Sequence, residues 1–387
     1  MGKKPEKQKL WEILAPGLLA AVVFLSIDHL PFFQDWDNKI YGGLLNMEYA
    51  LRRPPPAIKD IAIVGIDNDT VLNMPSRWPY ARSDFAAVIE NIKKAGPRAI
   101  GIDFAYLGKS NPKDDAALKS SLDDGRLVLA TTIDGHGYLD TSYAFSLRAQ
   151  ATYGIITKLQ DEDGAIRRGL IYLVSVKKTD NAFLSWEMQL LKIAKGLDTN
   201  SIVDKGDEVL FKNTSGEQWD VPVDPVSKSF LIHFRAHTKD FRILSFYKVL
   251  KNNFDPSLLK NKIVLIGVLP SLFQDSQNTA FGWMPGVVLN ANAFLALYTH
   301  DFLDKAPLWS QALLVMFLAG LVSFFMSSME KLAALAVIVW GVSLFSGLSY
   351  LFLTLGLTLD YAPFLFVMVL CPSVFQKLAK KIKKYLA

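Results

Sequence analysis

Three aspartates follow apolar runs that are typical of buried strands, and carboxylates at such positions can bind a ligand. Asp67 and Asp103 each come directly after a run of this kind, and Asp275 lies downstream of another. In open α/β sheets the carboxyl ends of parallel strands form the usual ligand crevice. The sequence therefore predicts a ligand site with Asp67, Asp103 and Asp275. The alternative for each carboxylate is that it only caps a turn or the start of a helix.

The loop after the first run adds an aromatic and a basic side chain to the same region. Trp78 and Arg82 lie a few residues after Asp67. Together they could clamp an anionic or aromatic ligand, or Arg82 could form an ion pair with Asp67 or Asp103. We favour the ion pair and keep both residues as ligand-site candidates.

A catalytic interpretation of the same segment is also open. The apolar run followed by Asp67 and Asp69 is similar to the first motif of haloacid-dehalogenase-type phosphatases, where the first aspartate is the nucleophile and Mg²⁺ assists. Thr131 or Thr132 could supply the second motif of that family. A lysine and a late acidic pair at strand ends are also needed, and the sequence offers no convincing set. We therefore predict no catalytic residues and keep the phosphatase as a remote alternative.

The histidines do not predict a metal site. His233 and His237 have a spacing seen in metal sites, but on a strand they would lie about 13 Å apart. The single cysteine, Cys371, lies in an apolar stretch and cannot form an internal disulfide. We expect two surface histidines, no metal and no cofactor.

The elements around these residues alternate between strand and helix. A helix is expected to start after Ser83 and to end before Gly96, between two apolar strands, and right-handed crossovers make such strands parallel. The middle of the chain, about 150–245, is richer in short β segments. The expected fold is an α/β domain with a largely parallel sheet. The expected strands are 61–66, 98–102, 126–133 and 262–268, and a further helix is expected over 286–298.

Four apolar stretches are long enough to cross a bilayer. The composition agrees, with 51% hydrophobic and only 20% charged residues. We expect the first stretch to be an uncleaved anchor rather than a signal peptide. The expected division is a cytoplasmic N-terminus at 1–10, helices at 11–33, 308–327, 332–353 and 356–375, a soluble domain at 34–306 and a basic tail at 376–387.

The lysines predict the orientation of these helices. They precede the first stretch, separate the second from the third and follow the fourth, which the positive-inside rule makes cytoplasmic. Residues 34–306 are then extracytoplasmic, and they carry equal numbers of basic and acidic side chains, which argues against nucleic-acid binding. The tail could bind anionic lipid or a cytoplasmic partner, or could only fix the orientation, through Lys380, Lys381, Lys383 and Lys384.

Six sequence blocks follow one another along most of 34–306. The first combines Ile66–Asp67, Trp78–Arg82, Gly96–Pro97 and Gly101–Asp103, and the others are Asp161–Arg168, Phe230–Arg235 with Phe241 and Ser245, Lys262–Gly267, Asp275 with Thr279, and Pro285–Asn292. Together they resemble the CHASE2 domain, the extracytoplasmic sensor module of bacterial signalling receptors. The resemblance implies one membrane helix before the domain and three after it, and it adds Thr279 to the ligand-site candidates. Two positions depart from the family pattern: Asn290 stands where a histidine is frequent, and Ala280 stands where a proline is frequent.

The resemblance implies a function in signal transduction rather than catalysis. We expect a multi-pass receptor of the bacterial cytoplasmic membrane that recognises an unknown small ligand or an envelope protein. CHASE2 receptors usually continue into a kinase or cyclase, which this sequence does not contain, so we expect signalling through a separate membrane or cytoplasmic partner, in a homodimer or hetero-oligomer. A structural or assembly subunit that docks an envelope protein is the main alternative, and a transporter is disfavoured because the spans offer no charged pathway.

Overall fold

The computed structural model describes residues 6–104, 106, 110–132, 152–174, 182–269, 275–326 and 331–370. Contacts divide the chain into two compact units. We call residues 49–302 the α/β unit, and residues 1–48 with 303–387 the helical unit. Each unit has its own hydrophobic core.

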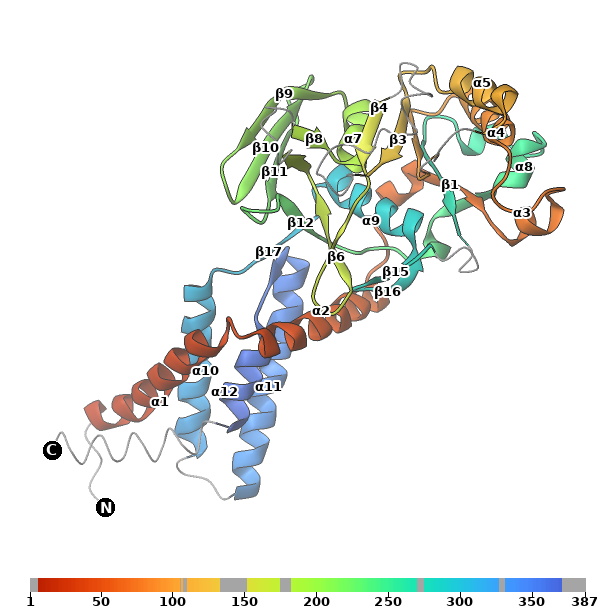
Figure 1. The fold of residues 1–387 in the computed structure, drawn as a ribbon. Helices are drawn as coiled ribbons and strands as arrows, with labels where there is room; N and C mark the ends of the chain where they lie inside the picture. The colour runs from red at the N-terminus through yellow and green to blue at the C-terminus, as the bar shows by residue number, and fades with distance from the viewer. Residues whose placement is uncertain are drawn as a thin grey trace. The chain divides into compact units, whose positions relative to one another are not determined.

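The α/β unit is built on a six-stranded parallel sheet within the described residues (Figure 1). All neighbouring strands in it run parallel. The order is β13-β1-β14-β2-β3-β4. The bounds are β1 Ile61–Ile66, β2 Ala99–Ile102, β3 Leu127–Thr131, β4 Thr152–Ile155, β13 Arg242–Ser245 and β14 Ile263–Val268.

The predicted strands are confirmed, but their order in the sheet could not be read from the chain. β1 and β2 are parallel as expected, yet β14 lies between them and pairs with both. β1 and β14 are buried at every position, which is the reason for their continuous apolar sequence. The sheet therefore pairs two strands, β1 and β14, that lie about two hundred residues apart in the sequence.

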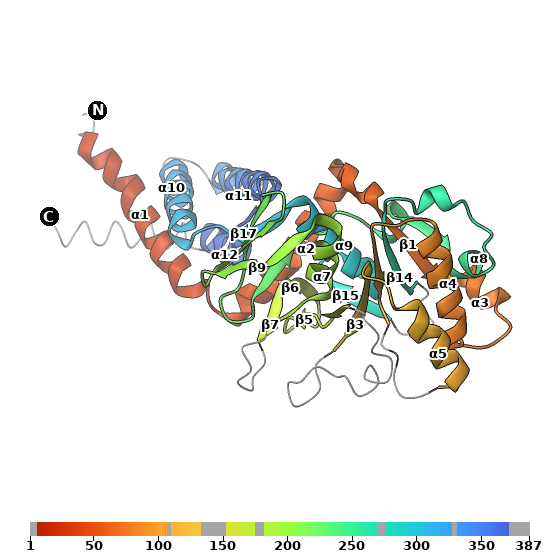
Figure 2. The same cartoon turned by 90° about the horizontal axis from the view of Figure 1, so that it is seen from above.

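Helices cover both faces of this sheet (Figure 2). On one face α4, α5 and α8 pack on alternate side chains of the strands, and on the other face lie α7 and α9. Helix α4 begins at Arg82 with Ala81 as its N-cap, two residues before the expected start, and Ser83 is not the cap. The bounds are α3 Asn68–Asn73, α4 Arg82–Lys94, α5 Pro112–Ser121, α7 Trp186–Lys195, α8 Phe246–Leu250 and α9 Gly286–Thr299.

The β-rich middle of the chain forms smaller sheets in the same unit. One has the order β16-β15-β6-β12 with β5 beside β6, another has the order β11-β10-β9, and β7 pairs with β8. The short 3-10 helices are η1 Pro56–Asp60, η2 Thr238–Asp240 and η3 Pro256–Leu258. The strands are β5 Leu159–Gln160, β6 Ile166–Leu170, β7 Tyr172–Val174, β8 Ala182–Leu184, β9 Leu197–Asp204, β10 Glu208–Asn213, β11 Gln218–Pro222, β12 Ser229–Ile232, β15 Ser276–Thr279 and β16 Gly282–Pro285.

The helical unit packs apolar helices around a core of small and aromatic side chains. α1 and α10 lie so close that a Cβ at Gly17 would meet the Met316 carbonyl oxygen at 2.3 Å. Its elements are α1 Glu6–Ile27, the start of α2 Pro31–Leu51, the end of β17 Phe302–Lys305, α10 Leu308–Met326, α11 Lys331–Thr354, β18 Leu357–Thr358 and α12 Tyr361–Leu370. By length and composition α10 and α11 are candidate membrane spans, with a third if the bent pair α1–α2 counts as one.

The expectation of one helix over 11–33 is wrong. α1 ends at Ile27, and α2 starts at Pro31 after a bend of 95°. The physical reason is Pro31: proline favours the first turn of a helix and disfavours helical geometry in the residue before it. The expected fourth span is described only for α12, and its end, Cys371 and the tail lysines lie outside the described residues.

Candidate functional site

Four ionisable side chains and one amide interact with one another at the carboxyl edge of the parallel sheet. Asp103 follows β2 and Lys158 follows β4, while Asp275 lies between β14 and β15. Glu187 is in the first turn of α7 and Asn290 is on α9, the two helices that cover this face of the sheet (Figure 2). We call these five residues the charged cluster.

Asp103 is the centre of the charged cluster. Its Oδ2 accepts a hydrogen bond of 3.1 Å from the Asn290 amide. The pKa of Asp103 is raised to about 7, mainly by burial and also by the negative charges of Asp275 and Glu187, against the opposing effects of Lys158 and Asn290. The carboxyl group is therefore poised to gain or lose a proton near neutral pH.

Asp275 is held beside the first turn of α9. A Cβ at Gly286 would lie 2.7 Å from Asp275 Oδ1, so glycine is required for this close approach. The Gly286 N–H donates to the Asp275 backbone carbonyl at 3.0 Å. Burial raises the pKa of Asp275 to about 6, and a hydrogen bond from Gln277 opposes the shift. Asp103 and Asp275 thus interact with positions 290 and 286, which share one face of α9.

Lys158 and Glu187 form a buried ion pair in the same cluster. Lys158 Nζ lies 2.8 Å from Glu187 Oε1, and the exposed fractions of the two side chains are 5% and 1%. Lys158 also donates to the Ile156 carbonyl at 3.1 Å. Glu187 Oε2 is buried without a hydrogen-bond partner among the described residues, which is costly for a charged oxygen. The cluster thus holds three carboxyl groups and one ammonium group, so it lacks positive charge when all three carboxyl groups are ionised.

Asp67 is engaged in a cap rather than in this cluster. Its Oδ1 accepts hydrogen bonds from the Thr70 amide at 2.8 Å, the Thr70 hydroxyl at 2.7 Å and the Ser245 hydroxyl at 2.8 Å. Asp67 is the N-cap of α3, and the network ties α3 to the end of β13. Asp69, the second aspartate of the phosphatase-like motif, accepts from Asn73 within α3. These contacts favour the cap among the alternatives that the sequence left open.

Trp78 and Arg82 also have structural contacts. Trp78 packs against Tyr80 and Phe104, with ring centroids 5.4 and 5.8 Å apart. Arg82 is 7% exposed and forms an ion pair of 2.7 Å with Asp115 on α5, a partner that the sequence did not suggest. Trp78 therefore joins the core beneath α4, and Arg82 links α4 to α5.

Thr279 and the two histidines are likewise engaged locally. The Thr279 hydroxyl donates to the Gly282 carbonyl at 2.6 Å and closes the β15–β16 turn. The expectation of two surface histidines is wrong for His233, which is 2% exposed and bonded through Nδ1 to Asp301 at 2.7 Å. His237 stacks on Phe281. Within the part of the chain that is described, no three His, Cys, Asp or Glu side chains are grouped to hold a metal ion.

The sequence therefore singled out two members of the charged cluster and missed three. Lys158 has a signal, because it follows a short β segment as Asp103 does. Glu187 has another, because it lies two residues after the N-cap Ser185. Asn290 was noticed only as a departure from the family pattern. That Asp103 and Asp275 bind a ligand remains a prediction.

Comparison with known proteins supplies the family. The model of the CHASE2 domain matches residues 18–326. The chain belongs to the CHASE2 domain family. The match runs from within α1 to the last residue of α10, so CHASE2 here includes apolar helices as well as the α/β unit. CHASE2 is a sensor domain that is typically non-catalytic. No curated protein and no solved structure matches the chain.

Proposed function

We propose that this CHASE2 protein is a membrane receptor whose α/β unit binds a small organic cation at the charged cluster, outside the cytoplasm. The observation that carries the proposal is the excess of buried carboxylates over ammonium groups around Asp103. Burying a charged group costs folding free energy unless an opposite charge is paired with it. Lys158 is the single basic partner within the cluster. A protonated amine or guanidinium group would supply the missing charge and a donor for Glu187 Oε2.

An organic cation fits this environment better than a metal ion does. Divalent ions need several convergent oxygen or nitrogen ligands at short distance, and the described residues offer no group of three. Asn290 is an amide that both donates and accepts, so it would suit a ligand with mixed polar groups. The cation would also replace the protons that Asp103 and Asp275 hold near neutral pH.

A route for signal transmission exists within the helical unit. The chain passes between the two units at α2 and at β17. In the helical unit both segments are anchored on the hairpin between α11 and α12: Asp37 Oδ1 accepts from the Ala362 N–H at 2.6 Å, and Lys305 pairs with Asp360 at 2.9 Å. We propose that ligand binding shifts these two segments together and that a cytoplasmic partner detects the resulting movement of the spans.

Ligand binding is tested on the full chain in lipid nanodiscs by thermal unfolding. Putrescine, lysine, arginine and choline are the cationic probes, and glutamate, succinate and glucose are the controls. We expect at least one cationic probe to stabilise the protein, and we expect Asp103→Asn with Asp275→Asn to abolish that shift. The apparent affinity should be at least tenfold weaker at pH 5 than at pH 7.5, because protons compete with the cation.

Asp220→Asn is the matched control, since Asp220 is an exposed aspartate of the same unit whose Oδ1 contact is to Gln218. It should leave the response unchanged. Stabilisation by the anionic or neutral compounds alone, or by none of the probes, would contradict a cation site. The partner is tested by crosslinking in the native membrane and mass spectrometry: a captured kinase or cyclase supports a receptor, whereas capture of envelope proteins alone supports a docking module.

A further inference from the structure

Helix α2 has an apolar aromatic side that no described residue covers. Phe32 and Trp36 are 64% and 50% exposed, and their rings lie 6.1 Å apart. Met47 lies on the same side of the helix and is 40% exposed. The neighbouring side is polar, with an ion pair of 2.7 Å between Asp35 and Lys39. α2 is therefore amphipathic along its exposed surface, apart from the side by which it contacts the rest of the helical unit.

The direction of α2 follows from the bend that precedes it. α1 presents exposed apolar side chains from Leu14 to Leu25, as a helix in contact with lipid does. Its apolar part, from Leu10 to Ile27, is close to the ~20 residues that cross a bilayer. The segment Pro31–Leu51 turns from Leu14–Ile27 by 95°, and Figure 2 shows the two helices meeting at this bend. A helix at right angles to a membrane-spanning helix runs along the membrane plane rather than across it. Its aromatic side begins within a few residues of the end of α1.

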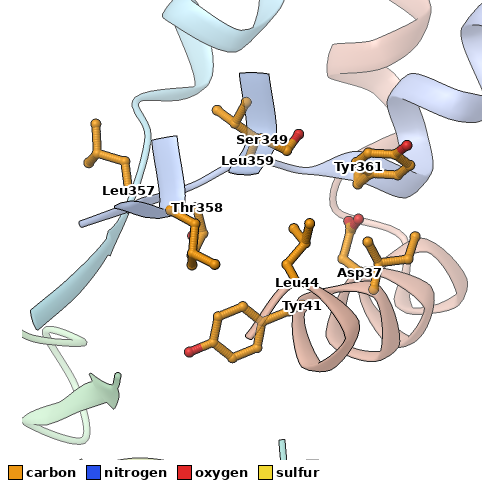
Figure 3. Close-up of a pocket in the computed structure, with 10 residues that line it drawn as sticks. Asp37, Tyr41, Leu44, Ser349, Leu357, Thr358, Leu359 and Tyr361 are labelled. Carbon is orange, nitrogen blue, oxygen red and sulfur yellow. The ribbon is translucent and has the colours of Figure 1, made fainter. Parts of the chain in front are cut away.

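The depth of α2 follows from what its buried side contacts. Phe33 meets Phe366 of α12 with ring centroids 5.4 Å apart. Asp37 is bonded to the start of α12. Between α2 and the hairpin is a small recess. Figure 3 shows Tyr41 and Leu44 of α2 on one side of it and Ser349 and Leu359 on the other. α2 is thus held at the level where α11 ends and α12 begins, which is the level of a membrane boundary.

From these observations we propose that α2 is an interfacial helix, with Phe32 and Trp36 inserted among the lipid chains and with Asp35 and Lys39 at the headgroups. The occupant of the aromatic side is the lipid bilayer rather than a protein, because that side continues directly from the lipid-exposed surface of α1. Aromatic rings are enriched at this depth of a membrane, where an apolar body and a polar surrounding are both satisfied. The proposal does not depend on the ligand.

Spin labelling tests the depth of each side of α2 separately. In a Cys371→Ser background, single cysteines replace Phe32, Trp36, Asp35 and Lys39, and the protein is reconstituted in phosphatidylcholine–phosphatidylglycerol vesicles. The label's exposure to oxygen, which partitions into lipid, is compared with its exposure to a water-soluble nickel chelate. We expect a preference for oxygen at 32 and 36 and a preference for nickel at 35 and 39. Val22→Cys on α1 and Val226→Cys in the α/β unit serve as lipid and water references.

Two results would overturn the proposal. Equal preference for nickel at all four positions would place α2 in water, and low exposure to both reagents at 32 and 36 would mean that a protein surface covers the aromatic side. The native side chain provides a second readout that needs no label. Brominated lipids should quench the wild-type tryptophan fluorescence more than that of Trp36→Phe, and equal quenching would also contradict the proposal.

Discussion

Aspartates that follow strands in this protein differ in how their oxygens are satisfied. Asp67 Oδ1 receives three hydrogen bonds and is fully used by the α3 cap. Asp103 has an amide partner and lies near two further carboxylates, Asp275 and Glu187. The first arrangement stabilises the fold and leaves little capacity for a ligand. The second stores unfavourable charge that a bound cation relieves, which is the physical basis of the proposed site.

Asp103→Asn should change how stability depends on pH. The pKa of Asp103 is raised from 3.8 to about 7, so the native protein keeps a proton that the unfolded chain loses. Stability contributed by this residue is therefore lost as pH rises from about 4 to about 7. Thermal unfolding of the ligand-free protein should show Asp103→Asn to be more stable than wild type at pH 8, by on the order of 3 kcal/mol, with little gain at pH 4. An equal difference at both pH values would argue against a raised pKa.

Asn292→Ala should destabilise the α/β unit strongly. Asn292 is fully buried, its Oδ1 accepts from the Arg235 and Ala236 amides at 3.1 Å each, and its amide donates to the Ala236 carbonyl. Removing it leaves several buried backbone groups without partners, at a cost of about 3 kcal/mol. Asn290→Ala on the same helix is the comparison. Denaturant unfolding should show the larger loss for Asn292→Ala, and similar losses would show that this network is not the cause.

At the scale of elements, the close packing of α7 on the sheet determines the position of Glu187. A Cβ at Gly154 of β4 would approach the Trp186 Cα at 2.4 Å, and a Cβ at Gly101 of β2 would meet the Trp186 ring at the same distance. The Trp186 indole N–H also donates to the Val128 carbonyl of β3. Because Glu187 follows Trp186 directly, the packing of the Trp186 ring on the sheet brings the Glu187 carboxylate to the edge of the sheet near Lys158.

Gly154→Ala should therefore destabilise the fold and disturb the charged cluster together. The added methyl meets backbone rather than a flexible side chain, so α7 has to shift, and such overpacking costs about 2–3 kcal/mol. Gly125→Ala is the control, because a Cβ there has no neighbour within 4 Å. Thermal unfolding should show a lower melting temperature for Gly154→Ala and a nearly unchanged one for Gly125→Ala. A small effect at position 154 would show that α7 is not tightly seated.

At the scale of the whole molecule, the family match joins the α/β unit to apolar helices on both sides of it. Residues 18–326 include α1 and α10, which belong to the helical unit. A CHASE2 domain in this chain is therefore a sensor-type unit built together with its candidate membrane helices. The positive-inside rule, applied to the flanking lysines, predicts that the α/β unit is extracytoplasmic and that both termini are cytoplasmic.

Cysteine labelling tests this topology. In a Cys371→Ser background, Val226→Cys places a thiol at a position that is 90% exposed in the α/β unit, and Lys384→Cys places one in the tail. With a membrane-impermeant maleimide on intact cells whose outer barrier is opened, we expect labelling at 226 at once and at 384 only after the inner membrane is permeabilised. The reverse pattern would invert the topology and remove the extracytoplasmic sensor from the proposal.

Sequence alone determined the features that depend on local order. The apolar runs of β1, β2, β3 and β14 predicted buried strands because such runs have few other stable locations in a soluble domain. The apolar stretches predicted membrane helices, and the lysines predicted their orientation, because both signals lie in the local sequence. The family blocks were also local, and the match to CHASE2 agrees with them. Asp103 and Asp275 could be proposed from their place after strands.

Tertiary structure decided what depends on pairing between distant segments. β14 lies between β1 and β2 in the sheet. The local sequence of a strand does not determine which other strands it will pair with. The Lys158–Glu187 pair exists because α7 folds back onto β4. The Asp67 cap on Thr70 is local, but its further hydrogen bond from Ser245 exists because β13 pairs with β1. Long-range contacts set these positions, since each depends on the free energy of packing two surfaces rather than on the preferences of one segment.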